Sequence, residues 1–449
     1  MAEDKGITKI TIQGFKSLYD ECSIAIVPLT ILAGANSSGK SSIMQPLLLM
    51  KQTLEAPYNP GVFLLNGTHV KFTLEDRLFS YRDSGDRNRS FSVTLENENQ
   101  SIKTTYEKQV QRNIEIVESI HTYGNNELKF HQNMTKDEIF DILSSYDSDF
   151  KHLLPEYRKK QNLKLDLTNR RGFANILAQF VINFNIPGYP KGFSSEIIYP
   201  LYDSNNLIQS FTASILQILH LPGLRGSPKR SYPTTAIGQE FPGTFEKYTA
   251  SLISYWQQTQ DERLEKLRAN LKQLGLTWTV EATQINDVQV ELRVGLMLKQ
   301  TANLQTVNIA DVGIGVSQVL PVLVALLVAE PGQLVYLEQP ELHLHPRAQV
   351  ALGEILADAA KRGVKVVIET HSELLLIAIQ TLVAEEKLNP DLVKLHWFTR
   401  QEDGRTIVNS SNLDEMGAYG DWPEDFGDIS MTLDRRYLDA AEAKLFENS

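Results

Sequence analysis

Eight residues, Gly34-Ala-Asn-Ser-Ser-Gly-Lys-Ser41, constrain this chain more than any other stretch. They match the phosphate-binding loop pattern G-x-x-x-x-G-K-[ST] and lie between an apolar run at 28–33 and a mostly apolar segment at 42–50. Backbone N–H groups and a helix start supply positive potential to a phosphate in such a loop. The pattern therefore predicts a strand, a nucleotide-binding loop and a helix. A Ser/Gly-rich turn without a ligand is the alternative.

The side chains of this loop have separate expected roles. Lys40 is placed for the β- and γ-phosphates of ATP or GTP, and Ser41 is placed for Mg²⁺. The glycines allow the backbone to wrap a phosphate. The other residues expected to contact the nucleotide are Gly34, Asn36, Ser37, Ser38, Gly39 and Ser42.

Composition is typical of a soluble globular protein, and the length of 449 residues predicts two or three domains, or one large domain with an insertion. The single cysteine, Cys22, excludes an intrachain disulfide framework and suits a reducing cytosol. The apolar run at 319–329 contains Pro321 and is too short to span a bilayer, and the first residues lack the layout of a secretion signal. A cytoplasmic location is expected. The net charge of −11 argues against a large nonspecific footprint on DNA.

The first half of the chain predicts strands followed by helices. Short strands are expected within residues 7–33, at 90–96 and within 102–120, and helices at 135–146 and 172–184. Between these helices, the stretch from Lys151 to Arg171 holds seven lysine and arginine residues but only two acidic ones. A solvated surface is the plainer interpretation, and contact with nucleic acid or another acidic partner is the alternative.

The second half predicts further helices and strands in alternation. Helices are expected at 207–220, 243–272 and 319–329, buried strands at 334–337 and 364–368, and strand pairs at 278–294 and 394–408. Residues 430–446 form an amphipathic pattern that fits either a helix packed on its own core or a docking surface. Arg225 and Arg230, in a turn rich in proline and glycine, could clamp a phosphate or bridge to acidic residues.

Several polar residues beyond the loop form the other half of a candidate site. Glu338 ends a buried strand, where a Mg²⁺ partner for Ser41 is expected. His371 ends the next buried strand and could reach a γ-phosphate or a water beside it. Small residues around Gly315 precede a helix and make a second phosphate-sized cradle. His343 and His345 suggest zinc at first sight, but their spacing favours turn packing.

The order and spacing of these segments resemble an ATP-binding-cassette (ABC) ATPase of the SMC-head type. The closest resemblance is to predicted bacterial ATPases related to the ATPase half of the overcoming-lysogenization-defect (OLD) nucleases. It rests on the segments at 338–346 and 369–373, on the opening strands around Phe15 to Ser17, and on a short tail at 417–424. It implies an α/β P-loop NTPase fold with bound ATP and Mg²⁺. The resemblance covers roughly residues 7–82 and 207–425, and we find no match for the middle.

The resemblance also implies roles for single residues. Lys16 is a candidate nucleotide contact, and Glu338 takes the place of the Walker B acid that holds Mg²⁺ with Ser41. Gly315 and Ser317 fall in the signature segment, which contacts the nucleotide of a second copy. A homodimer, or a higher oligomer, is therefore the expected active unit. His371 matches the switch histidine.

The chain departs from the family pattern at two places. The signature at 314–318, Ile-Gly-Val-Ser-Gln, is degenerate relative to the usual Leu-Ser-Gly-Gly-Gln. Gln339 stands where the catalytic glutamate usually lies, and an amide cannot act as a carboxylate base, whose assistance is worth roughly 10²- to 10⁴-fold. Slow hydrolysis is expected, with Glu341 as a candidate replacement base.

These observations predict four regions. Residues 1–107 form the N-terminal ATPase lobe, 108–206 a helical insertion, 207–415 the C-terminal lobe with signature, Walker B segment and switch histidine, and 416–449 a tail. Too few residues follow the last motif for the nuclease domain of the OLD relatives. The expected function is thus an ATP-held sensor and scaffold for a separate nuclease or toxin in antiphage defence. Alternatives are an SMC-like DNA repair ATPase, although no sustained heptads support it, and a transporter subunit.

Overall fold

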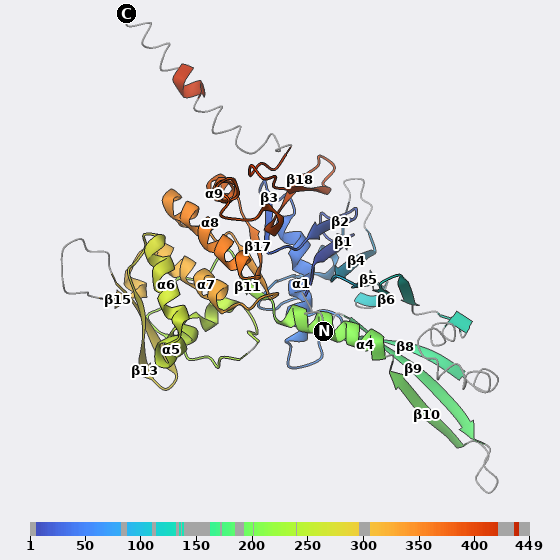
Figure 1. The fold of residues 1–449 in the computed structure, drawn as a ribbon. Helices are drawn as coiled ribbons and strands as arrows, with labels where there is room; N and C mark the ends of the chain where they lie inside the picture. Colours follow the sequence, from blue (N-terminus) through green and yellow to red (C-terminus); the bar gives the residue numbers. More distant parts are fainter. Residues whose placement is uncertain are drawn as a thin grey trace, which may run out of the picture.

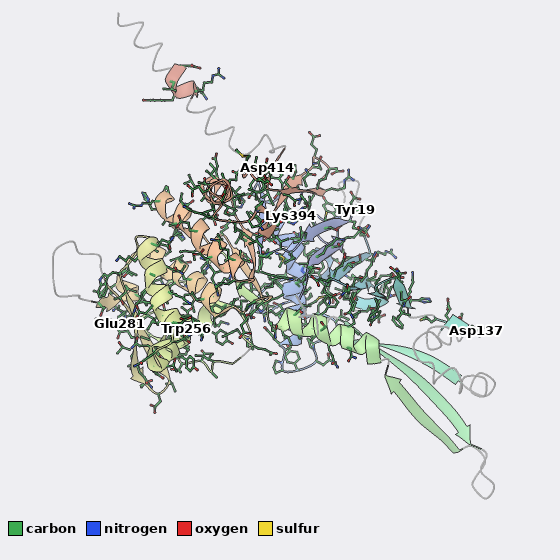
Figure 2. All side chains as sticks on the ribbon, viewed as in Figure 1. Tyr19, Asp137, Trp256, Glu281, Lys394 and Asp414 are labelled. Atoms are coloured by element: carbon green, nitrogen blue, oxygen red, sulfur yellow. The ribbon has the colours of Figure 1, made fainter. Side chains whose placement is uncertain are left out.

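The computed structural model describes the chain in the segments 6–81, 88–109, 114–131, 134–135, 137–138, 162–170, 173–184, 193–200, 202–238, 240–295, 306–420 and 435–439. Between 162 and 205 it describes the backbone path but not the side chains. Figure 1 shows two sheets at the centre of the protein, with helices α5 to α9 on one side. Figure 2 adds the side chains that fill these layers.

A mainly parallel sheet forms the centre of the protein. Its strand order is β11-β16-β17-β3-β18-β19, with β3 (Leu29–Gly34) between β17 (Lys365–Glu369) and β18 (Val393–Arg400). β16 (Leu334–Glu338) and β11 (Leu219–Leu221) continue it on one side, and β19 (Thr406–Asn412) ends it as an antiparallel edge strand. The predicted strands at 334–337 and 364–368 and the strand pair at 394–408 are confirmed.

The strands of this sheet are apolar on both faces because both faces are covered. Leu29 and Ile31 of β3 pack in one core with α7 (Ile314–Val328), α8 (Pro346–Lys361) and α9 (Glu373–Ala384). Leu32 packs in a second core, on the side of α1 (Lys40–Leu54). Pro46 lies inside α1 without ending it. The predicted order of strand, loop and helix is confirmed.

An antiparallel sheet covers the α1 side. It has the order β2-β1-β4-β5-β6-β7. Its strands are β1 (Lys9–Gln13), β2 (Cys22–Ala25), β4 (Ser90–Glu96), β5 (Gln100–Lys108), β6 (Ile114–Tyr123) and β7 (Asn126–His131). The predicted strands in this part are confirmed, and the sheet continues past residue 107 into the predicted insertion.

The part of the predicted helical insertion that the structure describes is mostly strand, with helix at 137–138 and from Tyr202 onward. Residues 172–184, predicted as a helix, form β9 (Phe173–Phe184), which pairs on both sides with β8 (Asn162–Arg170) and β10 (Phe193–Pro200). A short run rich in Phe, Ile and Val fits strand or helix equally by periodicity, and the pairing decides. The hairpin-like sheet projects from the body (Figure 1) and leads into α4 (Tyr202–Leu216). Most of the helix predicted at 135–146 lies outside the described residues.

The C-terminal lobe carries a small sheet packed on helices. The predicted helix at 243–272 is divided into a 3₁₀ turn at Phe245–Tyr248, α5 (Thr249–Thr259) and α6 (Glu262–Gln273). The break occurs at Gln260, whose φ is 55°, and the Asp261 side chain caps α6. β13 (Val280–Asn286) and β14 (Gln289–Gly295) form the predicted pair, and β12 (Tyr232–Pro233) and β15 (Thr306–Asn308) both pair with β14.

Within the described residues, none of the helices is long and apolar enough to cross a membrane. The amphipathic helix predicted at 430–446 lies largely outside them.

Candidate nucleotide site

The phosphate loop requires glycine at two positions because its backbone runs against its neighbours. Gly34 and Gly39 have φ values of +137° and +104°, which side-chain-bearing residues rarely adopt. A Cβ at Gly34 would lie 2.3 Å from the carbonyl oxygen of Phe398, and one at Gly39 would lie 2.5 Å from Oγ1 of Thr406. The loop is thus pressed onto β18 and the start of β19, and its shape depends on the C-terminal part of the sheet.

Lys40, which is expected to contact the phosphates, is hydrogen-bonded to the backbone of the phosphate loop. Its Nζ donates hydrogen bonds to the carbonyl oxygens of Gly34, at 3.0 Å, and Ala35, at 2.7 Å. Burial lowers the pKa of Lys40, and the nearby Glu369 carboxylate opposes this shift. Asn36 and Ser37 are exposed beside it, and Ser42 is buried in the first turn of α1.

Ser41 contacts an acid that the sequence reasoning did not select. Its hydroxyl donates a 2.8 Å hydrogen bond to Oε2 of Glu369, at the end of β17. The other carboxylate oxygen, Oε1, accepts a hydrogen bond from the Tyr336 hydroxyl. Burial raises the pKa of Glu369 to about 7, although hydrogen bonds from Tyr336 and Ser41 act in the opposite direction. The signal available in the sequence was a glutamate that ends a buried strand, like Glu338.

Glu338 lies beside Glu369 but faces other partners. The two residues are paired in the register of β16 and β17. Oε1 of Glu338 accepts from Nε2 of His220 at 3.0 Å, and Oε2 accepts from the backbone N–H of Gly223 at 3.1 Å. Burial acts to raise the pKa of Glu338, but these hydrogen bonds and nearby positive charges hold it below its ordinary value. Glu338 lines the same cleft as Ser41, whereas Glu369 is buried and reaches the cleft only through its hydrogen bond with Ser41.

The cleft beside the loop has a volume of about 1200 Å³. Lys16, a predicted nucleotide contact, lines it; its Nζ donates to Oε1 of Gln45 at 2.8 Å and lies 5.6 Å from the centre of the Phe72 ring. Burial lowers the pKa of Lys16. His69 and Val70 also line the cleft. The cleft therefore brings together positive side chains from separate segments, which suits a phosphorylated ligand.

The other candidate catalytic residues surround the end of β16. Gln339 has a φ of 45°, and its backbone N–H donates to the Glu369 carbonyl at 2.8 Å. Glu341 is 8% exposed; its Oε1 accepts from Oγ1 of Thr370 at 2.7 Å and from the His371 N–H at 3.3 Å. Burial raises the pKa of Glu341 and lowers that of His371. Interaction with the Gly34 backbone acts to raise the pKa of His371, against the effect of burial, so this histidine lies close to the phosphate loop.

Gly315 and Ser317 lie apart from this cleft. They belong to the first turn of α7, where the Ser317 hydroxyl donates to the Ile314 carbonyl at 2.8 Å. Among the residues described, neither lines the cleft that contains Lys40. Their predicted contact with nucleotide thus requires a second copy.

The remaining candidates have structural partners. Arg225 is 4% exposed and donates to the carbonyls of Gln318 and Glu338, at 2.9 and 2.8 Å, so it ties α7 to the end of β16. Arg230 pairs with Asp311. His345 caps α8, and the described part of the chain holds no group of three or more histidine, cysteine or acidic residues arranged for a metal ion. The turn-packing interpretation of these histidines therefore stands.

The residues present fit ATP with Mg²⁺. The buried Ser38 hydroxyl has no hydrogen-bond partner in the described residues, and it lies in the loop where phosphate oxygens are expected. Oxygen donors are the ligands that Mg²⁺ prefers, and Ser41, Glu338 and Glu369 supply them at one edge of the sheet. Mg²⁺ neutralises charge on the phosphates when it is bound.

Solved structures with a similar fold include three SMC head domains. One, bound to the C-winged helix domain of ScpA, matches with a TM-score of 0.46 and 11% identity over 91% of this chain and 98% of that one. The SMC head domain from Thermotoga maritima matches with a TM-score of 0.40 and 10% sequence identity, over 90% of this chain and 98% of that one. An SMC head domain with an extended coiled coil, bound to the C-terminal domain of ScpA derived from Pyrococcus furiosus, matches with a TM-score of 0.43 and 12% sequence identity. The match covers 91% of this chain and 96% of that one.

A search of curated protein sequences gave no match. Residues 29–378, by contrast, match the model of the family described as "AAA domain, putative AbiEii toxin, Type IV TA system". The matched region begins at β3 and includes the loop, the end of β16 and His371. The chain therefore belongs to this family of AAA-domain P-loop ATPases.

Proposed function

We propose that this protein is an ATP-held clamp: two copies close head to tail around ATP, and hydrolysis is slow. The observation that carries the proposal is Gln339 at the end of β16, directly after Glu338 and tied by its backbone to Glu369. The amide lies where a carboxylate base usually takes a proton from water, and it cannot accept that proton at neutral pH. The nucleotide is thus bound for longer than in a fast ATPase.

Glu341 is the available substitute for the missing base. Its Oε2 is buried with no hydrogen-bond partner among the described residues, while Oε1 is held by Thr370 and His371. A carboxylate with a raised pKa and one free oxygen is suited to accept a proton. Its position behind Gln339 makes it a less effective base than a glutamate at 339 itself.

The separation of Lys40 from Ser317 supports the dimer. Lys40 lies in the cleft, and Ser317 lies on a different surface, at the start of α7. In a head-to-tail pair, Gly315 and Ser317 of one copy complete the site that contains Lys40 of the other.

We infer further that the clamp regulates a separate effector, a nuclease or toxin, in antiphage defence. The family name refers to a putative toxin and a toxin–antitoxin system, which supports a role of this kind. The relation to OLD-type ATPases belongs to the same proposal, as do contact of the segment from Lys151 to Arg171 with nucleic acid and a cytoplasmic location. Co-purification from the native operon with ATP, followed by sizing, identifies the effector.

Complementation between two variants tests the head-to-tail clamp. Lys40→Ala removes the phosphate grip of its own site, and Ser317→Arg blocks the surface offered to the other copy. Each variant alone is expected to lose ATP-dependent dimers in light scattering. Mixed together, they form one pair with one intact composite site, so dimers and up to half the turnover return. A mixture no more active than its components excludes the composite site.

A further inference from the structure

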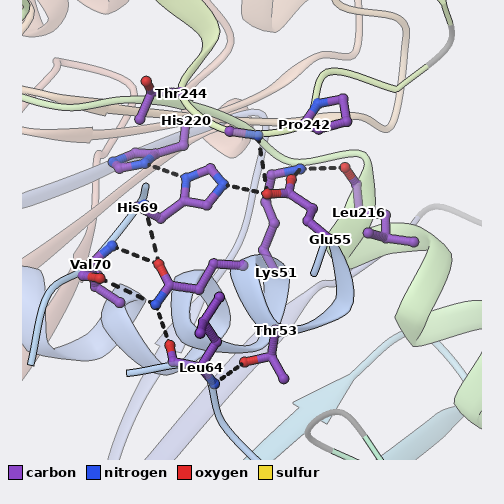
Figure 3. Close-up of polar contacts among 12 residues, drawn as sticks. Lys51, Thr53, Glu55, Leu64, His69, Val70, Leu216, His220, Pro242 and Thr244 are labelled. Carbon is purple, nitrogen blue, oxygen red and sulfur yellow. Dashed lines mark hydrogen bonds and ion pairs between the residues drawn. The ribbon is translucent and has the colours of Figure 1, made fainter. Parts of the chain in front are cut away.

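A buried chain of polar side chains leads from Glu338 to the far end of α1. Oε1 of Glu338 meets Nε2 of His220 at 3.0 Å, and Nδ1 of His220 meets Nδ1 of His69 at 2.9 Å. Nε2 of His69 then meets Oε2 of Glu55 at 3.2 Å, and Glu55 pairs with Lys51 at 2.8 Å. Figure 3 shows His220, His69, Glu55 and Lys51 following one another. Nothing in the phosphate-loop pattern predicts this chain.

These side chains are buried, so leaving any of their polar groups without a hydrogen-bond partner would cost free energy. The side chains of His69, His220 and Lys51 are all 0% exposed, and that of Glu55 is 10% exposed. The two histidine rings therefore have polar partners within hydrogen-bond distance at both of their nitrogens, which is how buried polar groups are tolerated.

This row of polar side chains connects three parts of the protein that border the candidate nucleotide site. Lys51 and Glu55 lie at the end of α1 and just beyond it, and Lys40 begins the same helix. His69 lies in the cleft wall with Val70, and Gln52 of α1 holds their backbone N–H groups at 3.1 and 2.9 Å. Nζ of Lys51 also donates to the carbonyl of Leu216, the last residue of α4, at 2.5 Å. One network therefore joins the phosphate helix, the cleft wall and the end of β16.

We propose that His220 and His69 are positioning residues that hold the Glu338 carboxylate in place for the nucleotide-bound Mg²⁺. This inference rests on the proposed ATP site. The carboxylate of Glu338 has two contacts, the backbone of Gly223 and the His220 ring. The first is fixed by the main chain. The second depends on His69, which orients the His220 ring from behind. Outer partners of this kind change metal affinity by roughly 10- to 100-fold when they are removed.

The test measures binding of a fluorescent ATP analogue with and without Mg²⁺, together with turnover. His220→Phe and His69→Phe keep the ring volume but remove the hydrogen bonds. Binding in EDTA is expected to stay within about twofold of the native protein, while the Mg²⁺ concentration for half-saturation rises roughly tenfold or more. His220→Gln, which retains a donor toward Glu338, is expected to recover most of the Mg²⁺ affinity. His69→Gln serves the same comparison if a Phe variant does not fold.

His121→Phe is the matched control. His121 is a buried histidine of β6, hydrogen-bonded to Ser119 at 2.9 Å and remote from Glu338 in the fold. Folded His220 and His69 variants with the native Mg²⁺ half-saturation overturn the proposal, as does an equal shift in the His121 control. Failure of the ATP site itself is distinguishable, because the native protein would then not bind the analogue at all.

Discussion

The Ser41 hydroxyl donates a 2.8 Å hydrogen bond to the carboxylate of Glu369, which joins the phosphate loop to the end of β17. Ser41 follows β3, and Glu369 ends the strand that pairs with β3. The acid in contact with the loop is thus Glu369, while Glu338 one strand further along is held by His220. The two carboxyl groups lie at adjacent strand ends.

Glu369→Gln is expected to weaken the Mg²⁺-dependent part of ATP binding by roughly tenfold. The amide oxygen still accepts from Ser41, but the negative charge that favours the metal is lost. Binding in EDTA should be unchanged or tighter, because a charge that repels the phosphates is removed. Titration of a fluorescent ATP analogue with Mg²⁺ measures both. Glu262→Gln, an exposed change on α6 that does not line the cleft, is the control, and identical Mg²⁺ curves for both variants would contradict the assignment.

Gln339→Glu is expected to accelerate ATP hydrolysis by roughly 10²- to 10⁴-fold and to shorten the life of the ATP-bound dimer. A carboxylate at this position supplies the base that the amide cannot provide. Phosphate release under saturating ATP gives the rate, and light scattering gives the dimer lifetime. Gln258→Glu, on the surface of α5, controls for the added charge. Brisk native turnover that the glutamate does not increase would show that Gln339 is not limiting.

Gly39→Ala is expected to abolish tight ATP binding and to lower the free energy of unfolding by about 1–3 kcal/mol. The added Cβ would meet Thr406 and Ser17 at 2.5 and 2.8 Å, so the loop must shift. Gly61→Ala is matched to it, because Gly61 also has a positive φ, +89°, but has no atom within 4 Å of the added carbon. Urea unfolding and ATP titration of the two variants separate backbone strain from the lost loop shape. Equal losses of ATP binding would rule out the contact.

The pH dependence of stability should include a contribution from His121. Burial lowers the pKa of His121 from 6.5 to about 4, so between these values the unfolded chain binds more protons than the folded one. The free energy of unfolding therefore falls as pH falls through this window. His121→Phe removes up to about 3 kcal/mol of this acid sensitivity. Urea unfolding of both proteins at pH 7.5 and 4.5 gives the difference, and parallel losses in the two would contradict it.

Short sequence patterns predicted those elements of the fold that depend on neighbouring residues in the sequence. The strand at Leu29–Gly34, its loop and its helix followed from glycine spacing and apolar runs, and so did Glu338 and His371 at strand ends. The role of Glu369 depends on β17 lying next to β3, a pairing between distant segments that no short pattern encodes.

Contacts between segments that are distant in the sequence also explain the other differences between the predictions and the structure. His69 and His220 meet only because a loop after α1 and the short strand β11 are folded together. The stretch Phe173–Phe184 became a strand through partners on both of its sides, not through its own periodicity. Gln339, by contrast, was recognisable from its place in the motif, although whether it slows hydrolysis remains a prediction.

The position of β3 in the sheet also determines when the phosphate loop gains its contacts during synthesis of the chain. Both of its neighbours in the sheet, β17 and β18, come from the last part of the chain. At about 5–20 residues per second, the roughly 330 residues between Ile31 and its partner Ile368 take tens of seconds to emerge from the ribosome. Until then the phosphate loop has neither Glu369 nor Thr406 beside it. The loop therefore gains these contacts only after the chain has been made past Thr406.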